Sequence, residues 1–222
     1  MGKINFNWWW FVFVTVIGCF TVACNSEEEN FGVYGYFLWE IRAGEMTIID
    51  YNGPGGDVTI PSQINGKPVT VIGEFVFNFN QLTQVTIPDS ITYIQQGAFA
   101  HNQLLHLIIP DSVTTIGMSA FLANGLVQVI IPDSVITIGG SAFALNNLTE
   151  ITIPHSVTSI GQRAFEQNQL IEISIGKNVY FTNVYDLMPF NNGFEAVYSN
   201  NGRQAGTYTR VNTTCTVWTR HE

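Results

Sequence analysis

Residues Ile109–Phe143 read IPDSVTTIGMSAFLANGLVQVIIPDSVITIGGSAF, and this stretch decides the fold because it contains nearly the same motif twice. The second IPDSV begins at Ile131, 22 residues after the first. The same spacing extends beyond the stretch in three sets of positions: Phe99, Phe121, Phe143 and Phe165; Ile94, Ile116, Ile138 and Ile160; Pro88, Pro110, Pro132 and Pro154. A fixed period in the twenties indicates a solenoid, in which each period is one turn of a coil.

Each unit follows roughly the pattern N-x-L-x-x-V-x-I-P-D-S-V-T-x-I-G-x-x-A-F, whose first half predicts a β-strand. In the unit that contains Leu82, strand alternation points Val85 and Ile87 into the core and Gln84 and Thr86 outward. One such turn cannot bury its own apolar face, so it is stable only when it stacks on a similar turn. The sequence therefore predicts a mainly β repeat solenoid of about five 22-residue units.

An asparagine opens each unit, and this position does not vary among polar residues. Two interpretations exist, a buried ladder of amides that satisfies backbone groups where the coil turns, or a solvated turn. A side-chain amide both donates and accepts, so a ladder explains why one residue type recurs, and we favour it. Neither interpretation is catalytic. The residues are Asn80, Asn102, Asn124, Asn146 and Asn168.

The stretch Ile109–Phe143 resembles the BspA-type leucine-rich repeats of bacterial cell-surface proteins, and the similarity extends over about Ile60–Ile175. Those repeats commonly have Cys where this chain has Asn, and the last unit here has Gly176 in place of Pro. The resemblance implies a leucine-rich-repeat stack. It also implies a binding function, with attachment to a host or bacterial surface protein, such as a host matrix protein or a protein on other bacteria.

The flanks of the repeats predict caps. Residues 37–59 read as strand, turn at Ala43-Gly44, strand and a Gly-rich turn, which predicts an N-terminal β cap. The repeats occupy residues 60–177, and Ile64–Pro68 inserts a hairpin-like turn into the first of them. Residues 178–222 offer two or three aromatic and β-branched strands with a turn at Asn200–Gly202, so we expect a C-terminal β-hairpin cap.

The N-terminus predicts export and a lipid anchor. Residues 1–23 have a short positive segment followed by an apolar one, which is typical of a signal peptide. Residues 21–24 resemble a bacterial lipoprotein signal in which Cys24 is acylated, and residues 24–36 would then be a lipidated tether. Cys19 is the alternative site of acylation. An uncleaved anchor and an ordinary signal peptide are further alternatives.

The charge of the chain excludes one class of partner. Removal of residues 1–23 takes away Lys3 alone among the charged residues, which leaves 7 basic against 17 acidic residues and a net charge of −10. So acidic a surface repels phosphate backbones, and we expect no nucleic acid partner. After that cleavage Cys24 and Cys215 are the cysteines that remain, which argues against a disulfide framework.

The sequence offers little chemistry. The four histidines have no metal-ligand spacing, and we find no phosphate-binding loop and no nucleophile elbow, so we expect no cofactor and no enzymatic activity. Asp89, Asp111 and Asp133 form a weak candidate for a Ca²⁺ site, because the stack would place them ~4.8 Å apart on neighbouring turns. The favoured alternative is a solvated Pro-Asp-Ser turn in which each Asp accepts local N–H bonds.

The outward positions of the strands form the candidate binding surface. Ile108 and Ile130 would lie side by side there, an apolar pair surrounded by polar residues. Five strands of ~17 Å give a face of about 400 Å², roughly half of what each partner contributes to a standard interface, so single contacts are weak and avidity is needed. The candidate ligand-binding residues are Gln84, His106, Ile108, Gln128, Ile130 and Glu150.

Three functional hypotheses follow. We favour a lipid-anchored, surface-exposed module of the bacterial cell envelope that binds a surface protein and mediates adhesion. The second hypothesis is a structural or decoy envelope protein without a dedicated ligand. The third, a hydrolytic enzyme, would need an acid/base pair that the sequence does not display.

Overall fold

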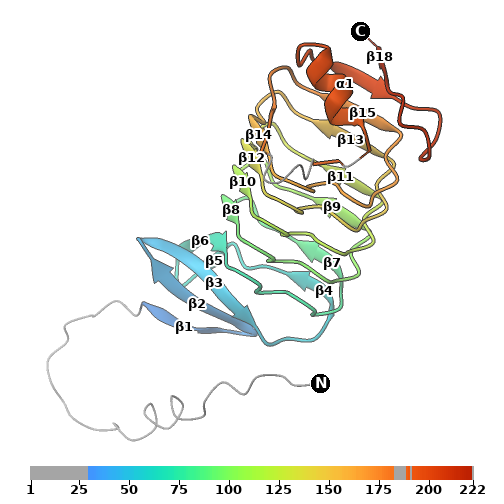
Figure 1. The fold of residues 1–222 in the computed structure, drawn as a ribbon. Helices are drawn as coiled ribbons and strands as arrows, with labels where there is room; N and C mark the ends of the chain where they lie inside the picture. The colour runs from blue at the N-terminus through green and yellow to red at the C-terminus, as the bar shows by residue number, and fades with distance from the viewer. Residues whose placement is uncertain (1–29, 183–188, 191, 222) are drawn as a thin grey trace, which may run out of the picture.

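The chain winds into a coil of stacked turns (Figure 1). The structure is a computed structural model, and it describes residues 30–182, 189–190 and 192–221. The predicted signal peptide, Cys19 and Cys24 lie outside the described residues. A mainly β solenoid was predicted, and this prediction is confirmed.

One side of the coil carries a column of parallel strands, which we call the strand face (Figure 1). Ladder pairing joins β4 to β7, β9 to β11, and β13 to β15. The pairing is interrupted between these pairs, where the strands still lie side by side. The members are β4 (Gly56–Thr59), β7 (Leu82–Thr86), β9 (His106–Ile108), β11 (Gln128–Ile130), β13 (Glu150–Ile153) and β15 (Glu172–Ile175).

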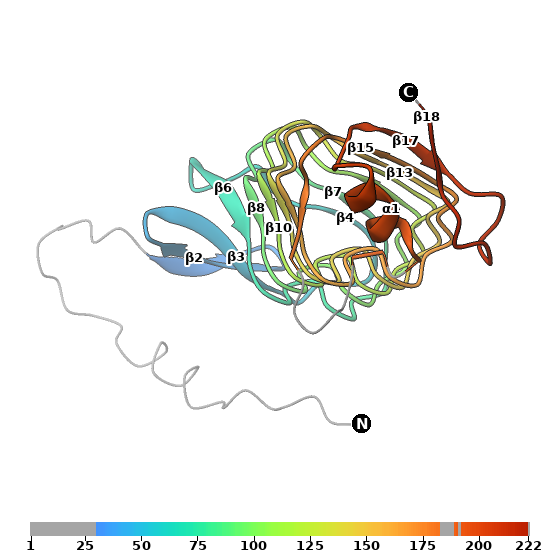
Figure 2. The ribbon, with the colours of Figure 1, turned by 45° about the horizontal axis from the view of Figure 1, so that its top comes forward.

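A second column of short strands, absent from our prediction, lies on another side of the coil (Figure 2). Most of these strands are two residues long, end at Ile94, Ile116, Ile138 or Ile160, and pair in parallel with the next turn. They form because stacking brings identical backbone segments together every 22 residues, although each segment alone is too short to read as a strand. They are β6 (Lys67–Ile72), β8 (Tyr93–Ile94), β10 (Thr115–Ile116), β12 (Thr137–Ile138), β14 (Ser159–Ile160) and β16 (Tyr180–Phe181).

The core between the columns is built from ladders of identical residues. Six phenylalanine rings stack along the coil axis, with neighbouring centroids 5.0 to 5.4 Å apart and planes within 10° of parallel. Leucine and isoleucine ladders are buried alongside them. The rings belong to Phe77, Phe99, Phe121, Phe143, Phe165 and Phe190.

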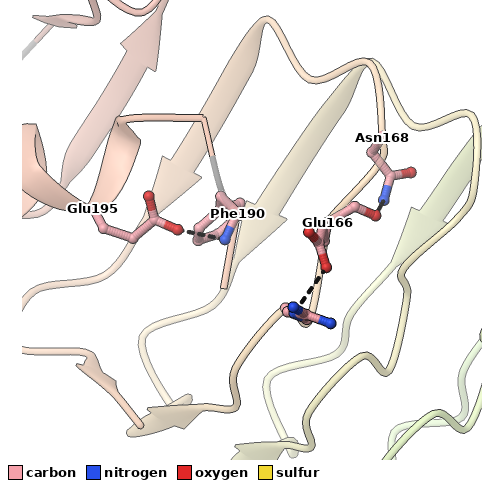
Figure 3. Close-up of polar contacts among 5 residues, drawn as sticks. Glu166, Asn168, Phe190 and Glu195 are labelled. Carbon is pink, nitrogen blue, oxygen red and sulfur yellow. Dashed lines mark hydrogen bonds and ion pairs between the residues drawn. The ribbon is translucent and has the colours of Figure 1, made fainter. Parts of the chain in front are cut away.

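The asparagine ladder is confirmed for Asn102, Asn124, Asn146 and Asn168, whereas the Asn80 amide donates to the carbonyl of Tyr51 instead. The Asn146 side chain is buried, and its Oδ1 accepts the backbone N–H of Leu126 at 3.0 Å. Its Nδ2 donates to the carbonyl oxygens of Phe121, Phe143 and Ala144 at 3.0 to 3.2 Å. Each amide therefore joins its own turn to the preceding one. The same pattern recurs in other turns, and Figure 3 shows part of it where Asn168 contacts the carbonyl of Glu166 at 3.5 Å.

The N-terminal cap is a three-stranded antiparallel sheet that continues the second column. Its strands are β1 (Phe31–Tyr34), β2 (Phe37–Arg42) and β3 (Glu45–Tyr51). The predicted strand, turn and strand are confirmed as β2 and β3, and the hairpin-like insertion is confirmed as β5 (Gln63–Ile64) paired with β6. Residues 24–36 were assigned to a tether, but Phe31–Tyr34 within that range form β1, which pairs with β2 and belongs to the cap.

The C-terminal cap differs from the predicted hairpin. The segment FEAVYSN was expected to be a strand, but it forms helix α1 (Phe194–Asn200). Phe194 and Tyr198 lie one helical turn apart and are fully buried against the end of the stack, so packing outweighs their preference for strands. The Glu195 carboxylate, also buried, accepts the backbone N–H of Phe190 (Figure 3).

A hairpin does follow the helix. It is formed by β17 (Gly206–Thr209) and β18 (Thr219–His221), and β17 adds antiparallel to β15. The repeat ladders also extend past Lys177, where we placed their end, because β16 pairs with β14 and Phe190 stacks on Phe165. Because β17 pairs with β15 and β18 pairs with β17, the strand face extends from β4 to β18.

Candidate binding surface

The six predicted ligand-binding residues lie together on the strand face, and all six are exposed. They come from β7, β9, β11 and β13. In the ladder between β9 and β11, Gln128 lies opposite His106 and Ile130 lies opposite Ile108. Ile108 is 76% exposed and Ile130 is 61% exposed, whereas Leu107 and Val129 between them and their neighbours are buried. Strand alternation thus presents the isoleucine pair to solvent, as predicted.

Two further exposed apolar residues lie immediately before β9 and β11 and were missed. Leu105 is 55% exposed and Val127 is 45% exposed, and the backbone N–H of Val127 donates to the carbonyl of Leu105 at 3.0 Å. They precede β9 and β11, at a position where neighbouring units have Thr83 or Thr149. The available signal was an apolar residue at a position that is threonine in these two units, a feature that Ile171 of the last unit shares. We call Leu105, Ile108, Val127 and Ile130 the apolar patch.

A shallow hollow lies beside the apolar patch, at the interruption of ladder pairing between β11 and β13. Its volume is about 260 Å³, and Ile130, Glu150, Thr152 and Glu172 contribute to its lining. A wider hollow of about 450 Å³ follows toward the C-terminal cap, where Thr207 of β17 forms part of the wall. The face is therefore uneven next to the patch, with room for a protruding side chain of a partner.

The hollow has an acidic rim. Glu150 of β13 lies in register with Glu172 of β15, and both side chains are exposed. Neither carboxylate has a hydrogen-bond or ion-pair partner among the residues that the structure describes. Like charges placed directly opposite each other in a sheet are destabilising, so this pair costs the free protein some stability. A positive group placed between the two carboxylates would relieve their repulsion.

The aspartates of the proposed Ca²⁺ ladder do not form a metal site. Asp89, Asp111 and Asp133 are exposed at turns that follow each proline. Within the described part of the chain, no group of three or more His, Cys, Asp or Glu side chains is placed to hold an ion. The three carboxylates are thus not grouped as the Ca²⁺ candidate requires.

The comparisons agree with this architecture. The model of a family described as the BspA type leucine rich repeat region matches residues 70–187 in six copies. Our sequence resemblance is thereby confirmed, and the match runs past the expected end of the repeats at Lys177. Comparison with curated proteins finds no match. Over the described residues, no helix is long and apolar enough to cross a membrane.

Several solved structures are similar. The pneumococcal vaccine antigen PcpA is 18% identical, with a TM-score of 0.53 over 67% of this chain and 50% of its own. The leucine-rich repeat protein of T. pallidum is 21% identical, with a TM-score of 0.51 over 75% of this chain and 94% of its own. These two show the shared fold.

A leucine-rich cell surface protein from Faecalibacterium prausnitzii is 26% identical, with a TM-score of 0.38 over 68% of this chain and 55% of its own. The chain thus spans about half the length of this protein and of PcpA.

Proposed function

Because this chain belongs to the BspA-type leucine-rich repeat family, we propose that it is a protein-binding module of the bacterial cell surface. In this proposal a lipid on Cys24 holds the module at the membrane, and the strand face contacts a protein on a host or on another bacterium. The apolar patch is the observation that carries the proposal, since it gathers exposed Leu105, Ile108, Val127 and Ile130 on two adjacent turns. An exposed apolar cluster rimmed by polar residues is typical of a contact site.

The size of the face predicts weak individual contacts. Strands of three to five residues are about 10–17 Å long, and eight strands from β4 to β18 span roughly 38 Å, which gives on the order of 500 Å². A standard interface uses about 800 Å² on each partner. Many anchored copies that act together would compensate, which suits adhesion.

The charge beside the patch defines the chemistry of the partner. An apolar side chain of the partner would cover Ile108 and Ile130, while a Lys or Arg would enter the hollow between Glu150 and Glu172. Burial of the isoleucines supplies free energy, and the carboxylates speed encounter with a basic surface.

The test is multivalent binding. The mature domain, displayed in many copies on beads, is presented to immobilised purified matrix proteins and to whole bacterial cells. We expect binding to at least one of these probes. The double variant Ile108→Glu/Ile130→Glu should weaken this binding by roughly tenfold or more, because the complex would then bury two charges where the wild type buries apolar surface.

The matched control is Ile136→Glu. Ile136 is also exposed, but it precedes β12 in the other column of strands. Both variants should keep the thermal transition of the wild type, because none of these side chains is in the core. Binding that survives the double variant, or that the control reduces equally, would contradict the use of the strand face.

A further inference from the structure

A second exposed apolar cluster lies at the N-terminal end of the stack, on β1 and the turn that follows it. Phe31 is 69% exposed and Val33 is 67% exposed, and Tyr34 and Tyr36 are exposed as well. Four such side chains within six residues exceed the scattered apolar exposure that is ordinary on a soluble surface. We call Phe31, Val33, Tyr34 and Tyr36 the aromatic edge.

The packing of β1 directs the side chains of Phe31 and Val33 outward. β1 is the outermost strand of its sheet, and it pairs with β2 along one side only among the described residues. Gly32 lies against Trp39, where an added Cβ would come within 2.8 Å of the indole ring. Close contact between β1 and Trp39 therefore needs glycine at this position. Phe31 and Val33, the neighbours of Gly32, must point to the opposite face, which nothing in the described chain covers.

We propose that the aromatic edge lies in the interfacial region of the bilayer that carries the lipid anchor. This inference rests on the proposed function through the lipid on Cys24. Only seven residue steps separate Cys24 from Phe31, so even a fully extended chain keeps Phe31 within about 25 Å of the acylated residue. The apolar patch is not constrained in this way, since Leu105, its first residue, lies more than seventy residues further along the chain.

The chemistry of the aromatic edge fits the headgroup region. Tyrosine is enriched there because its ring enters the apolar boundary while its hydroxyl stays hydrated, and phenylalanine adds apolar area. Glu27, Glu28 and Glu29 lie in the tether and repel anionic headgroups, so electrostatic attraction does not supply the contact. Weak apolar contacts suffice, because the lipid already holds the edge at a high effective concentration beside the bilayer.

Contact of the aromatic edge with the bilayer leaves the apolar patch accessible. The cap sheet of β1, β2 and β3 projects from the side of the coil that carries β6, β8 and β10, away from the strand face (Figure 2). A module that rests on the bilayer through the aromatic edge can still present the apolar patch to a partner. The anchor and the binding face thus act at the same time.

The two tryptophans of the mature chain provide the test. Trp39 lies under β1, and Trp218 lies in the C-terminal cap beside Arg210. The full chain with Trp218→Phe is processed in cells, its acylation at Cys24 is verified by intact mass, and it is reconstituted into phosphatidylcholine vesicles. Replacing the lipid with brominated phosphatidylcholine should cause a loss of Trp39 emission, because Trp39 packs against Gly32 in the strand that carries the aromatic edge, so contact of the edge with the bilayer brings the indole near the bromines.

Two variants separate the outcomes. The triple variant Phe31→Ser/Tyr34→Ser/Tyr36→Ser should restore the emission. Phe79→Ser, which removes an equally exposed ring from the stack, should leave the loss unchanged. An acylated protein whose Trp39 is not quenched, or is quenched equally in the triple variant, overturns the inference alone. If Trp39 is not quenched and the wild type forms dimers in detergent that the triple variant abolishes, the aromatic edge binds a second copy of the chain. That result also overturns the inference. If the intact mass shows no acylation at Cys24, both this inference and the proposed lipid-anchored module are overturned.

Discussion

At the scale of single residues, the asparagine ladder couples each turn to the one before it. A buried amide makes these bonds without introducing charge, and it satisfies both an N–H group and carbonyl groups that the bend of the coil leaves unpaired. Losing the Asn146 amide leaves the N–H of Leu126 buried without a partner and takes one donor from each of three carbonyl oxygens. That costs more than the bonds themselves contribute.

We therefore predict that Asn146→Ala lowers the free energy of unfolding by about 3 kcal/mol or more, measured by urea denaturation. Asn147 provides the matched control because it is the same residue type, one position along and exposed. Asn147→Ala should change the free energy of unfolding by no more than about 0.5 kcal/mol. Equal effects of the two substitutions would refute the role of the ladder.

At the scale of elements, the C-terminal cap covers the end of the stack with helix α1. The Tyr198 hydroxyl of this helix donates to the carbonyl of Gly176 at 2.6 Å and accepts the N–H of Val179 at 3.1 Å. Burial raises the pKa of Tyr198 above its ordinary value. The ring is fully buried, so the ionised form would be costly in this position.

The raised pKa predicts a loss of stability in alkali. In the unfolded chain the phenol ionises near pH 10, whereas in the folded chain it stays protonated to higher pH. The contribution is fully present below about pH 10 and is lost as the pH rises toward the folded pKa. Urea unfolding between pH 8 and 11 should show this decline, and Tyr198→Phe should make it shallower. Tyr180→Phe, at an exposed ring, is the control, and a wild-type decline in Tyr198→Phe would contradict the account.

The elements also show what the sequence can and cannot predict. The strand face, with Ile108 and Ile130 in register, followed from a period of 22 combined with strand alternation. The short strands such as β8 did not, because two residues have no pattern of their own and pair only when the turns stack. Helix α1 was missed because Phe194, Val197 and Tyr198 favour strands locally, and contacts with the end of the stack decide their conformation.

At the scale of the whole molecule, each turn contacts mainly the turns next to it, so stability is close to a sum over turns. Deleting residues 137–158 removes one full period and joins Ile136 to Ser159, which continues the pattern. We predict a folded protein with a lower free energy of unfolding and a smaller urea m-value, since less surface is exposed on unfolding. Deleting residues 137–147 removes half a period and should abolish the cooperative transition. If both deletion variants fold equally well, the turns do not need to be aligned in register, which would contradict this description of the stack.

Display of a binding module on the cell surface by a lipid can be measured in the cell that makes the protein. Membranes from that cell, grown with labelled palmitate, give the intact mass and the label, and protease added to whole cells tests exposure. We expect labelled protein that begins at Cys24 and is removed by external protease. Protein without label, or labelled protein shielded from protease, would contradict surface display and favour a structural role inside the envelope.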